Sequence, residues 1–148
     1  MKLISHRGNL TGPDKDLENN PNQIVKAIEY GFDVEIDVWL LDNQIYLGHD
    51  YPQFIINRDF LLDKPIWCHA KNLFALEFLL TNNITCFWHE SDKFTLTSNG
   101  FIWTYPNQPV NEKSIIVSFD RSPPKNLNCY GVCSDFVQTW KSENSNLF

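Results

Sequence analysis

Strand-like and helix-like segments alternate in the first half of the chain, and this order constrains the fold more than any other feature. Apolar runs predict strands at residues 2–6, 32–40 and 65–71, and helical patterns occupy residues 21–31 and 72–83. Repeated β–α units of this kind form a parallel sheet or a barrel. A full (β/α)8 barrel usually needs ~250 residues. A chain of 148 residues can therefore form only a barrel that lacks helices.

The second half indicates where those helices are missing. Short apolar runs predict strands at residues 84–90, 94–106, 114–120 and 129–137, with little helical periodicity between them. The polar tail from Lys141 is expected to fray. The sequence contains no internal repeat and no linker. We therefore predict a single domain over residues 1–148, of the α/β class, forming a reduced or incomplete TIM-type (β/α) barrel that is helix-poor in its second half.

Local signals define the ends of the two predicted helices. Asn19 or Asn20 can cap the first helix, Pro21 suits its first position, and Gly31 suits its end. Asn72 can cap the second helix in the same way.

Glu35 and Asp37 interrupt the apolar strand at residues 32–40. Side chains alternate along a strand, so both carboxylates share one face, roughly 6.5–7 Å apart at the Cα level. Two like charges so close raise each other's pKa unless a cation lies between them. Mg²⁺ or Ca²⁺ would supply that cation through oxygen ligands. The alternative is a strand with one solvated face, on which both acids simply meet water.

A hairpin brings His49 near this acidic pair. A two-residue turn at residues 42–43 would place Asp37 opposite Gly48, which then leaves room over the carboxylate. His49 is one residue out of phase with the acidic face, so a bulge or the end of pairing must turn it inward. Otherwise it is a surface histidine.

Cationic and titratable residues follow two other predicted strands. His6 and Arg7 end the first strand, and His69 and Lys71 end the strand at residues 65–71. In α/β barrels, residues at the carboxyl ends of strands line the active site. Acids for a metal, cations for an anion and histidines for proton transfer together indicate phosphoryl chemistry.

The same residues give the chain a resemblance to the glycerophosphodiester phosphodiesterase family, which is related to the phosphoinositide-specific phospholipase C barrels. Four motifs follow the family's order and spacing over roughly the first 50 residues: "HRG" at 6–8, "LENN" at 17–20, "EID" at 35–37 and "HD" at 49–50. Farther on, "IWCHAK", "FIWTYP" and "YGVCSDFV" resemble later strands of the family more loosely.

The resemblance implies a metal-dependent phosphodiesterase that hydrolyses a glycerophosphodiester-like substrate. It also implies a role for each matching residue: His6 and His49 as the general acid–base pair, Glu35 and Asp37 as ligands of Mg²⁺ or Ca²⁺, Arg7 and Lys71 as phosphate contacts, and Glu18 behind them in the helix-start motif.

His69 replaces the carboxylate that is the family's third metal ligand. It could coordinate the metal, which would favour Mn²⁺ or Zn²⁺ over Ca²⁺. It could stand off a Mg²⁺ ion completed by waters, or only hydrogen-bond a substrate or a neighbouring strand. Two other functions stay open, a phosphate-binding module without turnover and an enzyme that cyclises or transfers the phosphodiester, as the related phospholipase D toxins do.

Composition limits the partners. A net charge of −6 argues against nucleic acid and anionic membranes, and leaves a small-molecule phosphodiester as the expected partner. The sequence has no export signal and no long apolar run, so we expect a cytoplasmic protein without membrane insertion. Its four cysteines are expected to be free thiols. A barrel short of helices would expose apolar flanks that a homodimer could cover.

Overall fold

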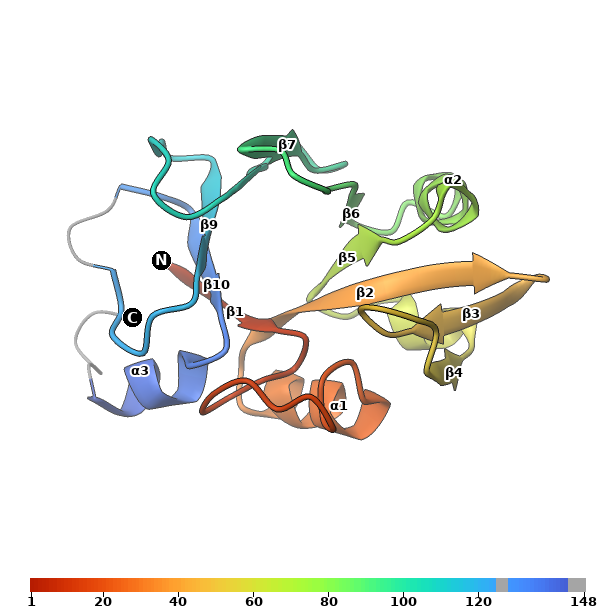
Figure 1. Ribbon diagram of the computed structural model, residues 1–148, viewed down its shortest axis with the longest axis horizontal. Coiled ribbons are helices and arrows are strands. Elements are labelled where there is room, and N and C mark those ends of the chain that lie inside the picture. Colours follow the sequence, from red (N-terminus) through yellow and green to blue (C-terminus); the bar gives the residue numbers. More distant parts are fainter. Residues whose placement is uncertain (125–127, 144–148) are drawn as a thin grey trace.

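The structure is a computed structural model that describes residues 1–124 and 128–143, and in these residues one curled mixed sheet is flanked by three α-helices (Figure 1). In chain order the elements are β1 (Lys2–His6), α1 (Pro21–Glu29), β2 (Asp33–Leu41), β3 (Gln44–Leu47), β4 (Phe54–Ile56), the 3₁₀ turn η1 (Arg58–Leu61), β5 (Ile66–Ala70), α2 (Leu73–Thr81), β6 (Cys86–Phe87), β7 (Phe94–Leu96), β8 (Ile102–Thr104), β9 (Ser114–Ser118), β10 (Gly131–Ser134) and α3 (Val137–Glu143).

Seven strands run parallel in the order β6–β5–β2–β1–β10–β9–β8, while β3 and β4 extend β2, and β7 extends β8, in antiparallel fashion. The sheet curls so that its β6 and β7 ends come near each other, although no ladder pairs these two strands (Figure 1). There the Ser98 amide donates to the Cys86 carbonyl at 2.8 Å, and the Thr95 hydroxyl donates to the Trp88 carbonyl at 2.7 Å. The α/β class, the incomplete barrel form and the helix-poor second half agree with the prediction.

Two apolar cores lie on opposite faces of the curled sheet. The outer core packs α1 and α2 against β2 and α3 against β1. The inner core fills the inside of the curl with a smaller set of buried side chains, mostly one from each strand: Ile4, Trp67, Phe87, Trp103, Ile115 and Cys133. Farther toward the carboxyl ends, β1, β2 and β5 carry the polar residues His6, Glu35, Asp37 and His69, so this part of the inner core supports a polar layer above it.

The predicted helix signals are confirmed. Asn20 caps α1, accepting a hydrogen bond from the Asn22 amide, and Pro21 occupies the first helical position. Gly31, just after the helix, has a φ of +86°, a conformation that favours glycine. The Asn72 side chain caps α2 by accepting from the Ala75 amide at 2.8 Å.

The hairpin prediction is right in register and wrong in one detail. Asp42 and Asn43 both have positive φ, and Val38 pairs with Leu47, which places Gly48 opposite Asp37. A Cβ on Gly48, however, would collide with the Tyr51 carbonyl oxygen rather than cover the Asp37 carboxylate. Gly48 is therefore required by the tight loop that follows the hairpin.

Three predicted strands need correction. The strand expected at residues 94–106 is two short antiparallel strands, β7 and β8, joined by residues 97–101. The strand expected at residues 129–137 ends at Ser134, and Val137 begins α3, whose Val137 and Trp140 side chains are fully buried at helical spacing. The strand expected at residues 84–90 shrinks to the two residues of β6. Lys141 lies in the last turn of α3, and its Nζ donates to the Tyr30 carbonyl at 3.0 Å; residues 144–148 of the predicted tail lie outside the described residues.

All four cysteines are free thiols, as predicted. Three apolar side chains on α2, Leu73, Phe74 and Leu80, are more than half exposed. Among the described residues, none of the helices combines the length and the apolar character needed to span a membrane.

Candidate functional site

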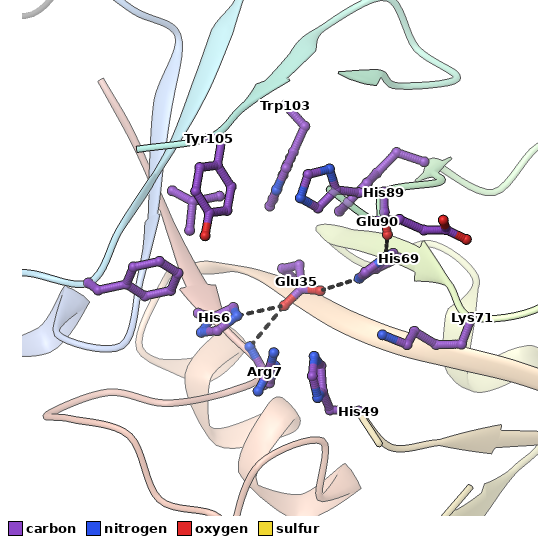
Figure 2. A pocket seen from close by; sticks show the side chains of 13 residues that line it. His6, Arg7, Glu35, His49, His69, Lys71, His89, Glu90, Trp103 and Tyr105 are labelled. Atoms are coloured by element: carbon purple, nitrogen blue, oxygen red, sulfur yellow. Dashed lines mark hydrogen bonds and ion pairs between the residues drawn. The ribbon is translucent and has the colours of Figure 1, made fainter. Parts of the chain in front are cut away.

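A cavity of about 360 Å³ opens over the polar layer, at the carboxyl ends of the parallel strands (Figure 2). The structure brings six of the eight predicted site residues to its lining: His6, Arg7, Glu35, His49, His69 and Lys71. The other two support that lining from behind. Asp37 is wholly buried against Arg7 and Lys71, and Glu18 is paired with Arg7.

Glu35 and Asp37 share the inward face of β2, as the alternation predicts, and both are buried. Glu35 Oε2 accepts from the Arg7 backbone amide at 3.2 Å. Asp37 has more partners: its Oδ2 accepts from Asn19 Nδ2 at 2.9 Å and lies 3.2 Å from Arg7 Nε, and its Oδ1 lies 3.4 Å from Lys71 Nζ. The two acids therefore differ in how well their charges are compensated.

This difference appears in their pKa values. Burial raises the pKa of Glu35, and the negative charge of Asp37 raises it further. Burial also opposes ionisation of Asp37, but the charges of His69, Arg7 and Lys71 outweigh it and hold the pKa of Asp37 well below its ordinary value. Asp37 is thus a permanent carboxylate, whereas Glu35 lacks a cation of its own.

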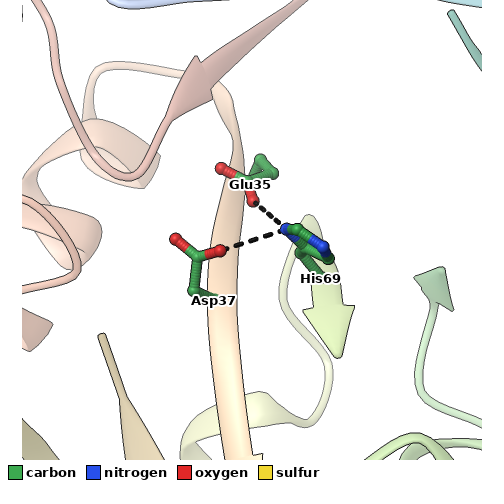
Figure 3. A group of neighbouring side chains, drawn as sticks. All are labelled: Glu35, Asp37 and His69. Atoms are coloured by element: carbon green, nitrogen blue, oxygen red, sulfur yellow. Dashed lines mark ion pairs between the residues drawn. The ribbon is translucent and has the colours of Figure 1, made fainter. Parts of the chain in front are cut away.

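His69 extends from β5 toward both carboxylates (Figure 3). Its Nε2 lies 2.8 Å from the His89 carbonyl oxygen, which can only accept, so Nε2 carries a proton. Its Nδ1 lies 3.1 Å from Asp37 Oδ1 and 4.0 Å from Glu35 Oε1. A neutral His69 would direct its lone pair at two oxygen atoms. This contact is favourable only if Nδ1 also carries a proton or if a cation lies among the three groups.

The same three residues have the composition of a metal site. Glu35, Asp37 and His69 each offer one ligand atom, and these atoms lie within 4.8 Å of one another. Asp37 Oδ1 is buried and receives no aligned hydrogen bond from the residues that the structure describes. A histidine whose other nitrogen donates to a backbone carbonyl is the usual form of a metal-ligating histidine. The donor set therefore fits a divalent cation.

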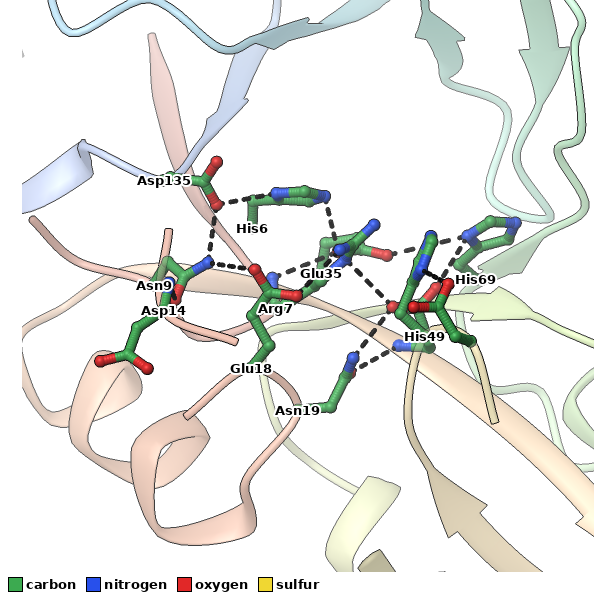
Figure 4. Close-up of polar contacts among 12 residues, drawn as sticks. His6, Arg7, Asn9, Asp14, Glu18, Asn19, Glu35, His49, His69 and Asp135 are labelled. Atoms are coloured by element: carbon green, nitrogen blue, oxygen red, sulfur yellow. Dashed lines mark hydrogen bonds and ion pairs between the residues drawn. The ribbon is translucent and has the colours of Figure 1, made fainter. Parts of the chain in front are cut away.

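His6, at the end of β1, is held by a residue that our sequence analysis missed (Figure 4). Asp135 follows β10 and its Oδ1 accepts from His6 Nδ1 at 2.8 Å, which leaves His6 Nε2 toward the cavity and 3.9 Å from Glu35 Oε2. Burial opposes the charged form of His6, but the hydrogen bond to Asp135 and the charge of Glu35 prevail and raise its pKa.

His49 is turned into the cavity by the loop after β3, where strand pairing ends. Its Nδ1 lies 2.7 Å from Asp50 Oδ1, so Nε2 is again the free nitrogen. Burial lowers the pKa of His49, and the charges of Arg7 and Lys71 act in the same direction. The two histidines are therefore oriented alike, each with a carboxylate on Nδ1, but their pKa values move in opposite directions.

Arg7 is fixed by the helix-start motif. Its backbone has a φ of +54°, rare for a residue with a side chain, and its carbonyl accepts from the Asn19 amide at 2.9 Å. Its guanidinium donates to Glu18 Oε2 at 2.9 Å while Nε faces Asp37. Asn19 is thus not the helix cap; it instead holds Arg7 and Asp37 in place through hydrogen bonds to both.

Sequence reasoning also missed one whole side of the cavity. Phe87, Trp103, Tyr105 and Phe119 form an aromatic wall of the cavity, and Figure 2 shows Trp103 and Tyr105 on the other side of Glu35 from Arg7 and His49. Phe87 ends β6, and Tyr105 and Phe119 directly follow β8 and β9, so the rule of strand ends that selected His6 would have selected these three; Trp103 lies inside β8. Asp135 also follows a strand, so the sequence held the same signal for it.

Comparisons of this chain with protein-family models, with curated proteins and with solved structures find no match.

Proposed function

We propose that this protein is a metal-dependent phosphodiesterase that hydrolyses a small phosphodiester, and that its curled sheet is a reduced TIM-type barrel of the phospholipase C-like kind. One observation supports this above all others. His69 presents Nδ1 to the buried carboxylates of Glu35 and Asp37 inside a cavity that is also lined by the other three histidines and by Arg7 and Lys71. The resemblance of the first 50 residues to the glycerophosphodiester phosphodiesterases supports the same function.

Charge balance in the cluster agrees with this proposal. Four carboxylates, those of Glu18, Glu35, Asp37 and Asp135, pair with Arg7, Lys71 or His6, and a fifth, Glu90, also lines the cavity. A divalent ion would offset the excess negative charge, which is concentrated on Glu35. Charged His6 would then match the single negative charge of a phosphodiester. Without the ion, an anionic substrate would approach an acidic site.

The chain's own residues can carry the proton transfers. Arg7 and Lys71 hold the phosphate by charge. Nε2 of one histidine accepts a proton from water as its oxygen attacks phosphorus, and Nε2 of the other donates a proton to the alcohol oxygen as the P–O bond breaks. Asp135 and Asp50 keep both Nε2 atoms directed into the cavity. Glu35, Asp37 and His69 would hold the ion. The chemistry that a bound divalent ion supplies is polarisation of the phosphoryl oxygens.

The direct test is hydrolysis of a panel of phosphodiesters by the purified protein, with Mg²⁺, Ca²⁺ or Mn²⁺ and with excess chelator. We expect metal-dependent release of one alcohol and a phosphomonoester. A cyclic phosphate product would indicate the cyclising reaction instead. Phosphate binding without any product would indicate a binding module. Activity that is unaffected by chelator would contradict the proposed metal dependence.

The metal preference should change in His69→Glu. An imidazole ligand softens a site and lowers its negative charge, so the native protein should prefer Mn²⁺ over Ca²⁺. His69→Glu adds a carboxylate at that position and should shift activity toward Mg²⁺ or Ca²⁺, measured as kcat/KM with each metal. Asn22→Glu is the control, because it adds the same carboxylate on the exposed face of α1, outside the cavity lining. A folded His69→Glu variant that is inactive with every metal would show that His69 has another role.

A further inference from the structure

The cavity is divided into two walls of different chemistry. The polar wall consists of His6, Arg7, Glu35, His69 and Lys71, and the aromatic wall adjoins it, with Phe119 beside His6 and Phe87 stacked on His69. In Figure 2, Trp103 and Tyr105 lie on one side of Glu35, and Arg7 and His49 lie on the other. A phosphodiester bound to the polar wall must therefore direct one of its substituents toward the aromatic wall.

The aromatic wall offers few hydrogen-bonding groups. Phe87 and Phe119 have none, and Val117 beside them is aliphatic. The polar groups on this side are the phenol of Tyr105 and the indole N–H of Trp103, with His89 and Glu90 next to them and away from His6. At the Phe119 and Val117 end, a polyol such as glycerol would lose hydrogen bonds to water without replacing them. An apolar substituent would instead gain contact area.

The wall also has the shape to receive a ring. Phe87 and Trp103 stack with ring centroids 4.3 Å apart, which fixes a rigid floor over the inner core. Tyr105 and Phe119 are about half exposed, at 47% and 54%, although large aromatic side chains are usually more buried. Phe119 lies beside His6, with ring centroids 6.2 Å apart. The substituent against Phe119 is therefore the one whose oxygen His6 reaches.

We infer that the alcohol on the His6 side of the phosphodiester carries an apolar ring, and that Phe119 and Tyr105 determine this specificity. The inference rests on the proposed function, because it takes the phosphate position from Arg7 and Lys71. It departs from the glycerol substrate that the sequence resemblance implies. The polar wall sets the reaction, and the aromatic wall selects the alcohol.

A binding experiment tests this specificity without turnover. We would titrate the metal-loaded protein with benzyl phosphate and with glycerol 3-phosphate by calorimetry, since both carry the same phosphate group. Aromatic contacts of this kind are worth about 0.5–1.5 kcal/mol beyond area burial, so we expect benzyl phosphate to bind about tenfold more tightly. Phe119→Ala and Tyr105→Ala should each remove most of that preference.

Phe94→Ala is the matched control, because Phe94 on β7 is similarly exposed, at 46%, and lies outside the cavity lining. It should leave the preference unchanged. Equal binding of the two phosphates, tighter binding of glycerol 3-phosphate, or a preference that survives Phe119→Ala would overturn the inference and leave the proposed function standing. If neither phosphate binds and no phosphodiester is hydrolysed, the proposed function falls with it.

Discussion

Asp37→Asn should abolish divalent-metal binding and also destabilise the metal-free protein by about 3 kcal/mol. Removing one partner of a buried ion pair typically costs roughly 3–5 kcal/mol, because the other charge is left uncompensated. We expect the lower end of this range, since Arg7 keeps its contact with Glu18 and Lys71 is partly exposed. Urea unfolding measures the stability, and calorimetric titration with Mg²⁺, Ca²⁺ and Mn²⁺ measures the binding.

The stability difference should depend on pH in a defined direction. The pKa of Asp37 is lowered in the folded protein, so its charge stabilises the fold above the unfolded value of ~3.9. This contribution is lost as the pH falls toward the lower folded pKa. The difference in unfolding free energy between the native protein and Asp37→Asn should therefore be largest at neutral pH and become smaller in acid. A gap that is constant with pH would show that Asp37 acts through shape rather than charge.

Two variants serve as controls for this result. Asp33→Asn removes a carboxylate from the same face of β2 at its other end, where Asp33 pairs with half-exposed Lys2, and it should leave metal binding intact. Glu35→Gln should also lose the metal, but with the opposite effect on stability. Because the pKa of Glu35 is raised, its charge costs stability as the pH rises. Metal-free Glu35→Gln should therefore be at least as stable as the native protein at neutral pH.

These opposite effects differ from the expectation that sequence alone gives. Two acids on one face of a strand predict mutual repulsion, and hence a gain in stability when either is removed. That reasoning applies to Glu35. It fails for Asp37, because Arg7, Lys71 and Asn19 converge on its carboxylate and no local pattern places their side chains there.

The parts of the site that the sequence predicts are those set by local rules. Alternation along β2 places Glu35 and Asp37 together, and the turn at residues 42–43 sets the register of the hairpin. The direction of a side chain at the end of a strand or helix is not determined by the local sequence pattern. His49 faces the cavity because pairing ends and a tight loop follows, and strand parity alone would have turned it outward.

Contacts between distant segments are the second kind of feature that no local sequence pattern predicts. Asp135 meets His6 across 129 residues because β10 closes onto β1, a pairing that only the whole sheet determines. The His89 carbonyl that fixes the tautomer of His69 is a backbone group, which carries no signal in residue type. The α3 helix was missed because Val137 also fitted the end of an apolar strand, and Val137 and Trp140 alone are too few apolar residues to show a helical period.

His6→Ala and His49→Ala should each lower kcat by ~10²-fold or more, the usual contribution of a general acid or base. The double variant should lose less than the product of the two effects, because the pair acts on one proton-transfer sequence.

Asp135→Asn should reproduce part of the His6 loss, since it removes the charge that holds His6 Nδ1 while leaving the histidine in place. The metal affinity of each variant distinguishes a role in proton transfer from a role in holding the metal site together. All these variants should retain metal affinity, as their side chains lie outside the group formed by Glu35, Asp37 and His69. Near-normal turnover in His6→Ala or in His49→Ala would remove that histidine from the mechanism, and loss of metal from Asp135→Asn would show that Asp135 supports the metal site rather than the histidine.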